Sequence, residues 1–449
     1  MPTPKTAPHS TCDIFCSVID NYGDIGVCWR LARLLAHEHG LAVRLWVDDL
    51  ASFAKLCPQA DASLLSQQQR SVMVCRWDQN FPLVQPADIV IAAFACKLPE
   101  TYVESMAKLE VGAAQVTTMA AKRHSLAEPD RREQGGACGL VAVNHADVLC
   151  AGRLPVWINL EYLSAEDWVE GCHKLPSPHP RLPLTKYFFF PGFTRQTGGL
   201  LLEHDLLARR DAFLADAEAQ QRYWQGLGIA QPRADTLKVS LFAYENAALR
   251  GLFDAWALGA KKVLCLVPEG RILSQVAAYF ADVERTLPRH GEGAMLNSDR
   301  RSYAHGNLQV RVLPFVAQEE YDLLLWACDV NFVRGEDSCV RAQWAGKPFI
   351  WQIYPQHDAV HRDKLQAFLL LYSATLSSSV RQAVQTLWTA WNDEGNAGAA
   401  WGGYAAASAP WTAHGQGWAR RLAGNDLALN LLDFCQETGR MRALEIEGQ

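Results

Sequence analysis

The alternation of predicted strands and helices is the feature that most limits how this chain can fold. A β-rich run at Cys12–Ile19, an amphipathic run at Val27–His39 closed by Gly40, and a strand at Leu41–Val47 form one βαβ unit. Another buried strand is predicted at Asp88–Ala95. The second half has predicted strands, with helices between most of them, at Leu237–Tyr244, Lys262–Val267, Val310–Phe315, Cys328–Val333 and Phe349–Ile353. This pattern predicts an α/β protein with parallel sheets covered by helices.

Length and the spacing of these patterns predict two domains. The chain has 449 residues, which exceeds what a single hydrophobic core usually supports. The alternation weakens at Val111–Leu154 and again at Arg289–Asn307, where we expect surface insertions or loops. The tail from about Arg420 to Met441 is predicted to be helical.

Charge and cysteine use exclude several classes of protein. A formal charge of -6 provides no basic surface for nucleic acid and no polybasic patch for a membrane. The 13 cysteines contain no Cys-x-x-Cys pair and lie partly in apolar runs, as expected for buried thiols in a reducing compartment. Met1–Ser10 lacks the apolar core of a signal peptide, and eighteen apolar residues never run together. We therefore expect a cytoplasmic protein.

The run Asn331–Ser338 predicts a strand, a polar turn and the start of a helix that ends at Gly346. Helix N-termini at the carboxyl ends of strands bind anions in open α/β folds. Arg334 adds a full positive charge in a planar fork that suits phosphate. A surface salt-bridge cluster capped by Asp337 explains the same residues, and this local pattern leaves both interpretations open.

The turn after the first predicted strand carries two carboxylates, Asp20 and Asp24, between which Gly23 allows a tight bend. Carboxylates repel phosphate, and neither Gly-x-Gly-x-x-Gly nor Gly-Lys-Ser/Thr is present in this turn. An Asx-turn at Asp20 and a helix cap at Asp24 are the ordinary structural alternative. Between two α/β domains, these aspartates would face residues 334–338 across a cleft. In that position the aspartates could accept a proton or bind a cationic group of the substrate. Arg334 and the predicted helix N-terminus at Ser338 could instead bind a diphosphate.

Aromatic residues end several strands of the second half. Phe242, Tyr244 and Phe315 are placed where a nucleotide base could stack, and Gln318 follows closely enough to hydrogen-bond that base. Ordinary core packing is the alternative for such rings. No Asp-x-Asp pair follows a strand to hold a divalent ion against a diphosphate, so we expect neither a metal nor a cofactor.

Together these runs resemble the EarP family, the bacterial arginine rhamnosyltransferases of translation elongation factor P. The matching runs are Ile14–Cys16, Val18–Val27, Glu161–Glu166, Lys186–Phe188, Gly198–Leu200, Val333–Ser338, Val340–Gln343, Ala345–Phe349 and Ile353–Gln356. The resemblance implies an inverting, metal-independent GT-B enzyme that transfers L-rhamnose from dTDP-β-L-rhamnose to an arginine of elongation factor P and thereby activates it.

The resemblance also implies a division into two Rossmann-like domains that face an interdomain cleft. Residues 1–195 would bind the acceptor and would be completed by a C-terminal helical segment, about 365–449, whose last helix packs back on this domain. Residues 196–364 would bind the nucleotide sugar.

Site roles follow from the same resemblance. Asp24 would be the general base, Asp20 would orient the acceptor, and Glu336 would be a third functional carboxylate. The thymidine of the donor would be bound by Phe242, Tyr244, Phe315 and Gln318. Its ribose and diphosphate would be bound by Arg334, Asp337 and Ser338.

Three other functions remain open from the residues alone. Asp48 and Asp49 follow the second predicted strand as a ribose-binding acid would in an NAD-dependent oxidoreductase, although the glycine fingerprint is missing. A GT-B-like nucleotide-sugar epimerase would turn over the donor without a protein acceptor. A non-catalytic module that binds a partner through exposed Trp residues would have no affinity for nucleotides.

Overall fold

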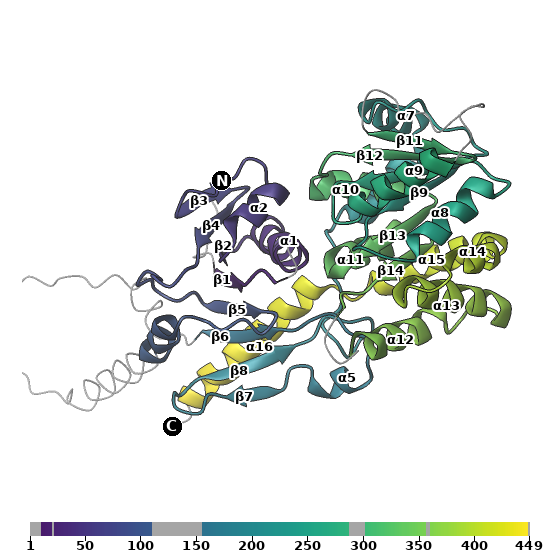
Figure 1. Cartoon of the computed structure of the whole chain (residues 1–449). Coiled ribbons are helices and arrows are strands. Elements are labelled where there is room, and N and C mark those ends of the chain that lie inside the picture. Colours follow the sequence, from purple (N-terminus) through teal and green to yellow (C-terminus); the bar gives the residue numbers. More distant parts are fainter. Residues whose placement is uncertain (1–9, 20–21, 110–154, 287–300, 356–359, 448–449) are drawn as a thin grey trace, which may run out of the picture.

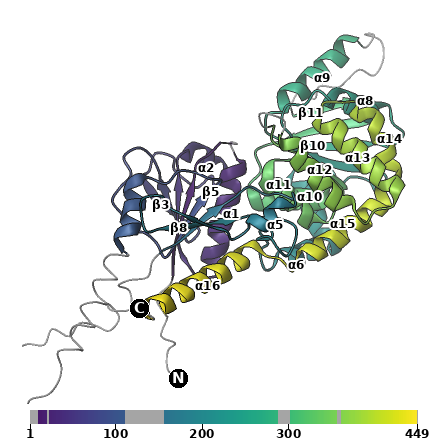
Figure 2. The same cartoon turned by 90° about the horizontal axis from the view of Figure 1, so that it is seen from below.

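Two α/β domains lie side by side, and a long C-terminal helix returns along the first of them (Figure 1). The computed structural model describes residues 10–19, 22–109, 155–286, 301–355 and 360–447. Seen from below, the C-terminal helix α16 (Leu427–Glu447) runs from the second domain along the edge of the first (Figure 2). The predicted α/β class with two Rossmann-like domains is confirmed.

The first sheet has eight strands in the order β3-β4-β2-β1-β5-β6-β8-β7. Its six central strands pair in parallel, and only the edge strands β3 and β7 are antiparallel to their neighbours. The strands are β1 (Thr11–Cys16), β2 (Ala42–Val47), β3 (Ser66–Gln69), β4 (Val72–Arg76), β5 (Ile89–Ala93), β6 (Val156–Leu160), β7 (Pro176–Pro178) and β8 (Thr185–Phe189). The accompanying helices are α1 (Gly23–His37), α2 (Leu50–Leu56), α5 (Trp168–Cys172) and a helix over residues 100–109.

The second sheet has six strands in the order β11-β12-β10-β9-β13-β14, and only β11 is antiparallel. The strands are β9 (Leu237–Leu241), β10 (Val263–Pro268), β11 (Ser302–His305), β12 (Leu308–Leu313), β13 (Val330–Arg334) and β14 (Phe349–Gln352). The helices are α6 (Leu206–Ala215), α7 (Ala217–Gly226), α8 (Leu249–Leu258), α9 (Leu273–Thr286), α10 (Gln318–Ala327) and α11 (Gly335–Ala345). Since β13 lies between β9 and the edge strand β14 and is parallel to both, the turn that follows it opens at the carboxyl edge of the sheet.

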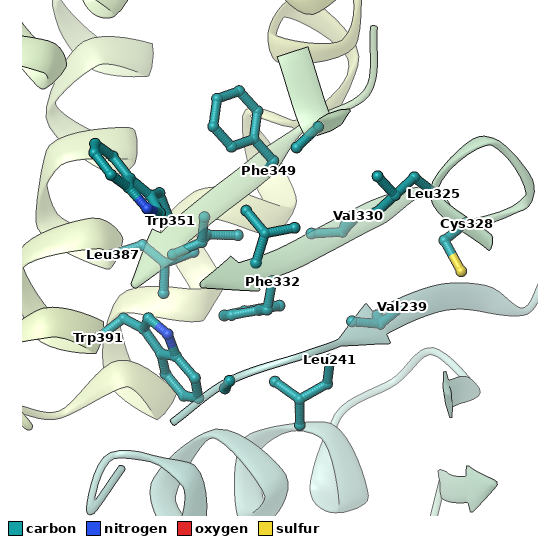
Figure 3. Packing of buried hydrophobic residues seen from close by; sticks show 14 of the residues in the cluster. Val239, Leu241, Leu325, Cys328, Val330, Phe332, Phe349, Trp351, Leu387 and Trp391 are labelled. Atoms are coloured by element: carbon teal, nitrogen blue, oxygen red, sulfur yellow. The ribbon is translucent and has the colours of Figure 1, made fainter. Parts of the chain in front are cut away.

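The core around β13 packs aromatic rings among aliphatic side chains (Figure 3). Phe332 is fully buried, with its ring 4.9 Å from that of Trp391 and 5.9 Å from that of Trp256. Val239 and Leu241 cover it from the neighbouring strand β9. Burying this apolar area fixes the strand that presents Arg334 at its end.

The C-terminal helices divide between the two domains differently from the predicted boundary. Four of them carry side chains that belong to the second core: α12 (Val360–Ser373), α13 (Ser378–Asn392), α14 (Ala397–Ala406) and α15 (Ser408–Leu422). Only α16 contributes to the first core, through residues such as Leu427, Leu431 and Phe434. The segment that completes the first domain is therefore α16 rather than the whole of 365–449, because the aromatic faces of α12 to α15 are buried against the second sheet.

The sequence predicts loops or insertions in two segments. The segment 289–307 is predicted to be a loop, but its described part contains the edge strand β11, which pairs with β12. The pattern was hard to recognise because Tyr303, Ala304 and His305 are only half-buried at the sheet edge. The predicted insertion at 111–154 lies outside the described residues.

Within the described ranges, no helix is both long enough and apolar enough to cross a membrane.

We expect Phe332→Ala to lower the free energy of unfolding of the second domain by about 3 to 5 kcal/mol, because it leaves a cavity between Trp256 and Trp391. Urea unfolding followed by tryptophan fluorescence measures this loss. Leu258→Ala is the matched control, since this apolar side chain is 82% exposed and its loss should change stability by less than about 0.5 kcal/mol. Equal stability of the two variants would contradict the assignment of Phe332 to the core.

Candidate active site

A pocket lies between the two domains, where the turn after β13 faces the start of α1. Six of the predicted nucleotide-site residues line it: Phe242, Phe315, Gln318, Arg334, Asp337 and Ser338. The first domain contributes Tyr22, Gly23 and Leu56 to its wall. The rings of Tyr22 and Phe315 are 5.1 Å apart and close the pocket from opposite domains. Residues distant in sequence are thus brought to one cavity, as the interdomain-cleft hypothesis requires.

Arg334 ends β13 and is buried with its guanidinium between two aromatic rings. Its Cζ atom lies 4.6 Å from the Phe242 ring centroid and 4.4 Å from that of Tyr244. Cation–π attraction on both sides fixes the position of this charge. Phe242 still reaches the pocket, whereas Tyr244 is buried behind Arg334 and is absent from the pocket wall. Tyr244 is therefore placed to hold Arg334 rather than to face the cavity.

Helix α11 begins at Gly335, three residues before the predicted N-terminus at Ser338. Gly335 has φ +63°, a conformation that favours glycine. The Ser338 hydroxyl bonds back to Arg334, accepting from its backbone N–H at 3.2 Å and donating to its carbonyl. Ser338 thus closes the first helical turn, and the first backbone N–H groups of the helix belong to residues 335–337. The predicted cap at Asp337 is also wrong, because Arg334 is the N-cap residue.

Asp337 and Gln318 meet the first domain directly. Arg30 of α1 donates from Nε to Asp337 Oδ1 at 2.9 Å. Gln318 donates from Nε2 to the carbonyl of Gly26 at 2.9 Å and accepts from Arg33 Nη2 at 2.9 Å. A side chain at position 26 would crowd this crossing, since an added Cβ would lie 3.3 Å from Gln318 Nε2. Both predicted nucleotide contacts therefore also tie the two domains together.

A buried network of charges continues behind Asp337. Arg30 donates to Glu203 at 3.0 Å, and Arg341 donates to Glu203 at 2.6 Å and to Asp322 at 2.7 Å. Arg30, Arg341 and Asp322 are almost fully buried, and Glu203 lies in the segment that joins the two domains. Burial alone would raise the pKa of Glu203, but the charges of Arg341 and Arg30 outweigh burial and hold that pKa well below its usual range.

Asp24 and Glu336 approach the cleft from opposite domains. Asp24 lies in the first turn of α1, is buried, and accepts from the backbone N–H of Ile19 at 2.8 Å. Glu336 accepts from the backbone N–H of Leu163 at 3.0 Å and from Lys364 Nζ at 3.2 Å. Burial raises the pKa of Glu336, Lys364 and the Leu163 N–H lower it, and the charge of Asp24 raises it. The two carboxylates are therefore close enough to influence each other.

Other predicted carboxylates have different positions. Asp20 lies outside the described residues. Asp49 caps α2 by accepting from the backbone N–H groups of Ala51 and Ser52, and Asp48 accepts from the Ser17 hydroxyl at 2.6 Å. These bonds give Asp48 and Asp49 structural roles and remove the feature that favoured an NAD-dependent oxidoreductase. No group of three or more His, Cys, Asp and Glu side chains in the described part of the chain could hold a metal ion.

Four residues near the cleft were not predicted from the sequence: Tyr22, Arg30, Tyr162 and Lys364. Tyr22 and Tyr162 lie inside runs that carried the family resemblance, so a functional interpretation of those runs could have included them. Arg30 and Lys364 gave no local signal, because each is a charged residue on a helix, α1 or α12, a position that usually faces solvent.

Known proteins resemble this chain over nearly its whole length. The family described as elongation factor P (EF-P) rhamnosyltransferase EarP matches residues 12–122 and 136–436. A protein-arginine rhamnosyltransferase of Pseudomonas putida is 47% identical over 430 residues, which covers 95% of this chain and 98% of the relative. A protein of the same description from Pseudomonas aeruginosa is 43% identical over 423 residues, covering 94% and 98% respectively.

One similar solved structure is described as the structural basis for EarP-mediated arginine glycosylation of translation elongation factor EF-P. It is 33% identical, covers 95% of this chain and 99% of its own, and superimposes with a TM-score of 0.58. The similarity therefore extends over both domains and the cleft between them.

We expect Glu203→Gln to lower the free energy of unfolding at pH 7 by about 3 to 5 kcal/mol, because Arg30 and Arg341 lose a buried partner charge. The folded-state pKa of Glu203 is depressed, so its contribution is fully present above the unfolded pKa of about 4.3 and is lost as pH falls through the folded pKa. The difference between wild type and variant should therefore shrink below about pH 4.3.

Urea unfolding at several pH values tests this dependence. Glu218→Gln is the control, because Glu218 is 86% exposed in its pair with Arg222 and should contribute little at any pH. If the difference in unfolding free energy between wild type and Glu203→Gln stayed constant down to pH 3, ionised Glu203 would not be the source of the stability.

Proposed function

The chain belongs to the EarP family of elongation factor P rhamnosyltransferases, and from that membership we propose that it transfers L-rhamnose from dTDP-β-L-rhamnose to an arginine side chain of elongation factor P. It is a glycosyltransferase with two facing Rossmann-like domains of the GT-B type. The observation that carries the proposal is the meeting of Arg334, Asp337 and Ser338 with the start of α1 in one interdomain pocket. Proteins of this description match almost the full chain.

The donor is proposed to bind on the second domain. Phe242 and Phe315 line the pocket with apolar faces on which a thymine ring could stack, and Gln318 supplies an amide at its edge. Arg334 supplies a fixed positive charge, and the first N–H groups of α11 lie beside it. A nucleoside diphosphate offers an aromatic base and an anion together, which suits this combination of partners.

The acceptor is proposed to enter from the side of Asp24 and Glu336. The pKa of arginine exceeds about 12, so a carboxylate does not deprotonate a free guanidinium in the ground state. Removal of the proton must accompany the attack of nitrogen on the anomeric carbon. Asp24 accepts this proton, and pairing of the guanidinium with carboxylates localises electron density on the attacking nitrogen.

Departure of the nucleotide is assisted from the opposite side of the sugar. Negative charge grows on dTDP as the bond to the anomeric carbon breaks, and Arg334 with the N-terminus of α11 stabilises it. Attack from the face opposite the nucleotide inverts the anomeric centre. These positive groups stand where a metal ion would otherwise act, so we propose a metal-independent reaction.

The reaction is proposed to take place in the cytoplasm. Its protein acceptor is a translation factor, and the 13 cysteines without a Cys-x-x-Cys pair suit a reducing compartment.

Incubation of the purified protein with dTDP-rhamnose and elongation factor P, followed by mass spectrometry, tests the proposal. We expect one deoxyhexose on one arginine of the acceptor. Donor turnover without a protein adduct would favour the epimerase alternative, and the absence of nucleotide binding would favour a non-catalytic module.

Asp24→Asn should lower kcat by about 100- to 10,000-fold, because the amide accepts no proton during attack. Affinity for dTDP, measured by calorimetry, should stay near that of the wild type, since Asp24 is not among the residues that line the nucleotide pocket. Asp49→Asn is the control at the same sheet edge, because asparagine caps α2 as well as aspartate does. Wild-type turnover by Asp24→Asn would rule out Asp24 as the base.

Arg334→Ala should weaken dTDP binding by roughly 10- to 100-fold, because charge-assisted hydrogen bonds contribute about 1.5 to 3 kcal/mol. Arg334→Lys should recover only part of this affinity, since lysine keeps the charge but loses the planar fork that lies between Phe242 and Tyr244. Calorimetry with dTDP measures both variants. Unchanged affinity in Arg334→Ala would show that the diphosphate binds elsewhere.

A further inference from the structure

Lys364 is a largely covered lysine of α12 whose ammonium pairs with Glu336 at the start of α11. Its side chain is 13% exposed, and its Nζ atom donates to Glu336 Oε1 at 3.2 Å. The same Nζ lies 5.4 Å from the centroid of the Tyr162 ring. A carboxylate and an aromatic face therefore fix the ammonium from two sides.

The surroundings of this ammonium are themselves rigid. The Tyr162 ring stacks on that of Phe94 with centroids 4.7 Å apart and an interplanar angle of 26°. Phe94 has φ +55° at the end of β5, and its backbone N–H donates to the Leu160 carbonyl at 2.7 Å. Tyr162 is thus anchored to the first sheet, and through it Lys364 of α12 in the second domain contacts the first domain.

Glu336 is fixed by one bond on each oxygen. Oε2 accepts from the backbone N–H of Leu163 at 3.0 Å, while Oε1 accepts from Lys364. With both bonds in place, the carboxylate has one orientation across the domain boundary. An acceptor guanidinium needs such fixed oxygen atoms, because misplacement of a reacting group by about 1 Å can cost roughly 100-fold in rate.

We propose that Lys364 is a positioning residue for rhamnosyl transfer, which holds the Glu336 carboxylate correctly oriented toward the acceptor arginine beside Asp24. The inference rests on the proposed function, because it assigns a role within that reaction. Lys364 touches neither donor nor acceptor in this role and acts through Glu336.

Several titratable groups face Glu336 and bear on the pH dependence. Lys364 lies on α12, Asp24 on α1, Tyr162 beyond β6, and Cys339 on its own helix. Burial raises the pKa of Glu336, and Lys364 lowers it. Loss of the ammonium therefore raises the pKa of Glu336 further. As the pH is lowered, the decline in activity should then begin at a higher pH than in the wild type. Lys364 also faces Glu161, whose pKa would move in the same direction.

Lys364→Met is the decisive variant, because methionine keeps the apolar length of the side chain and removes the charge. At pH 7 we expect kcat/KM for elongation factor P to fall by about 10- to 100-fold. The acidic limb of the pH–rate profile should move to higher pH, while affinity for dTDP stays unchanged. Lys364→Arg should restore most of the rate, since arginine keeps the positive charge.

Lys238→Met is the matched control. Lys238 forms an ion pair of similar length, 3.1 Å to Asp329, with a side chain that is 21% exposed on β9, remote from the cleft. Its loss should leave both rate and pH profile as in the wild type. A Lys364→Met enzyme with the wild-type rate, or with a reduced rate and an unmoved acidic limb, would overturn the proposal.

A crystal structure of Lys364→Met supplies a readout that does not depend on transfer. The Glu336 carboxylate should lose its single orientation and its bond to the Leu163 N–H, and an unmoved carboxylate would also overturn the proposal. Failure of the wild-type protein to modify elongation factor P would instead count against the proposed function, while the position of Glu336 would still decide the role of Lys364.

Discussion

The crossing of α1 and α11 is the contact on which the arrangement of the cleft depends. Arg30 brings one full charge from the first domain into the second, where Asp337 and Glu203 neutralise it. An arginine buried to this extent is stable only with such partners, because the cost of an unpaired buried charge is several kcal/mol. The pairing therefore favours one relative position of the two domains, and that position brings Tyr22 next to Phe315.

The same contact explains why opposite charges coexist in one short run of residues. Arg334 is enclosed by Phe242 and Tyr244, Asp337 turns to Arg30, and Glu336 turns to Leu163 and Lys364. Three neighbouring charges thus point to three different partners. Positive charge remains on the proposed donor side, and the carboxylate of Glu336 remains on the proposed acceptor side with Asp24.

Much of this architecture was predictable from local patterns, while the charge partners were not. Apolar periodicity located the strands that carry Phe242 and Arg334, because buried parallel strands have a strong signal in sequence. The exact helix start at Gly335 was missed, since Asp337 and Ser338 are common capping residues and glycine in a left-handed conformation has no apolar signal. Periodicity on a single helix also gives no information about a partner such as Glu203, which lies 173 residues from Arg30.

The missed residues share one physical property, which is that each acts across the domain boundary. Arg30 and Lys364 are long cationic side chains on helices, and such residues ordinarily extend into water. Their burial becomes favourable only when the other domain supplies a carboxylate, as Asp337 does for Arg30, or an aromatic face, as Tyr162 does for Lys364. The least predictable residues of this cleft therefore lie where the two domains must recognise each other.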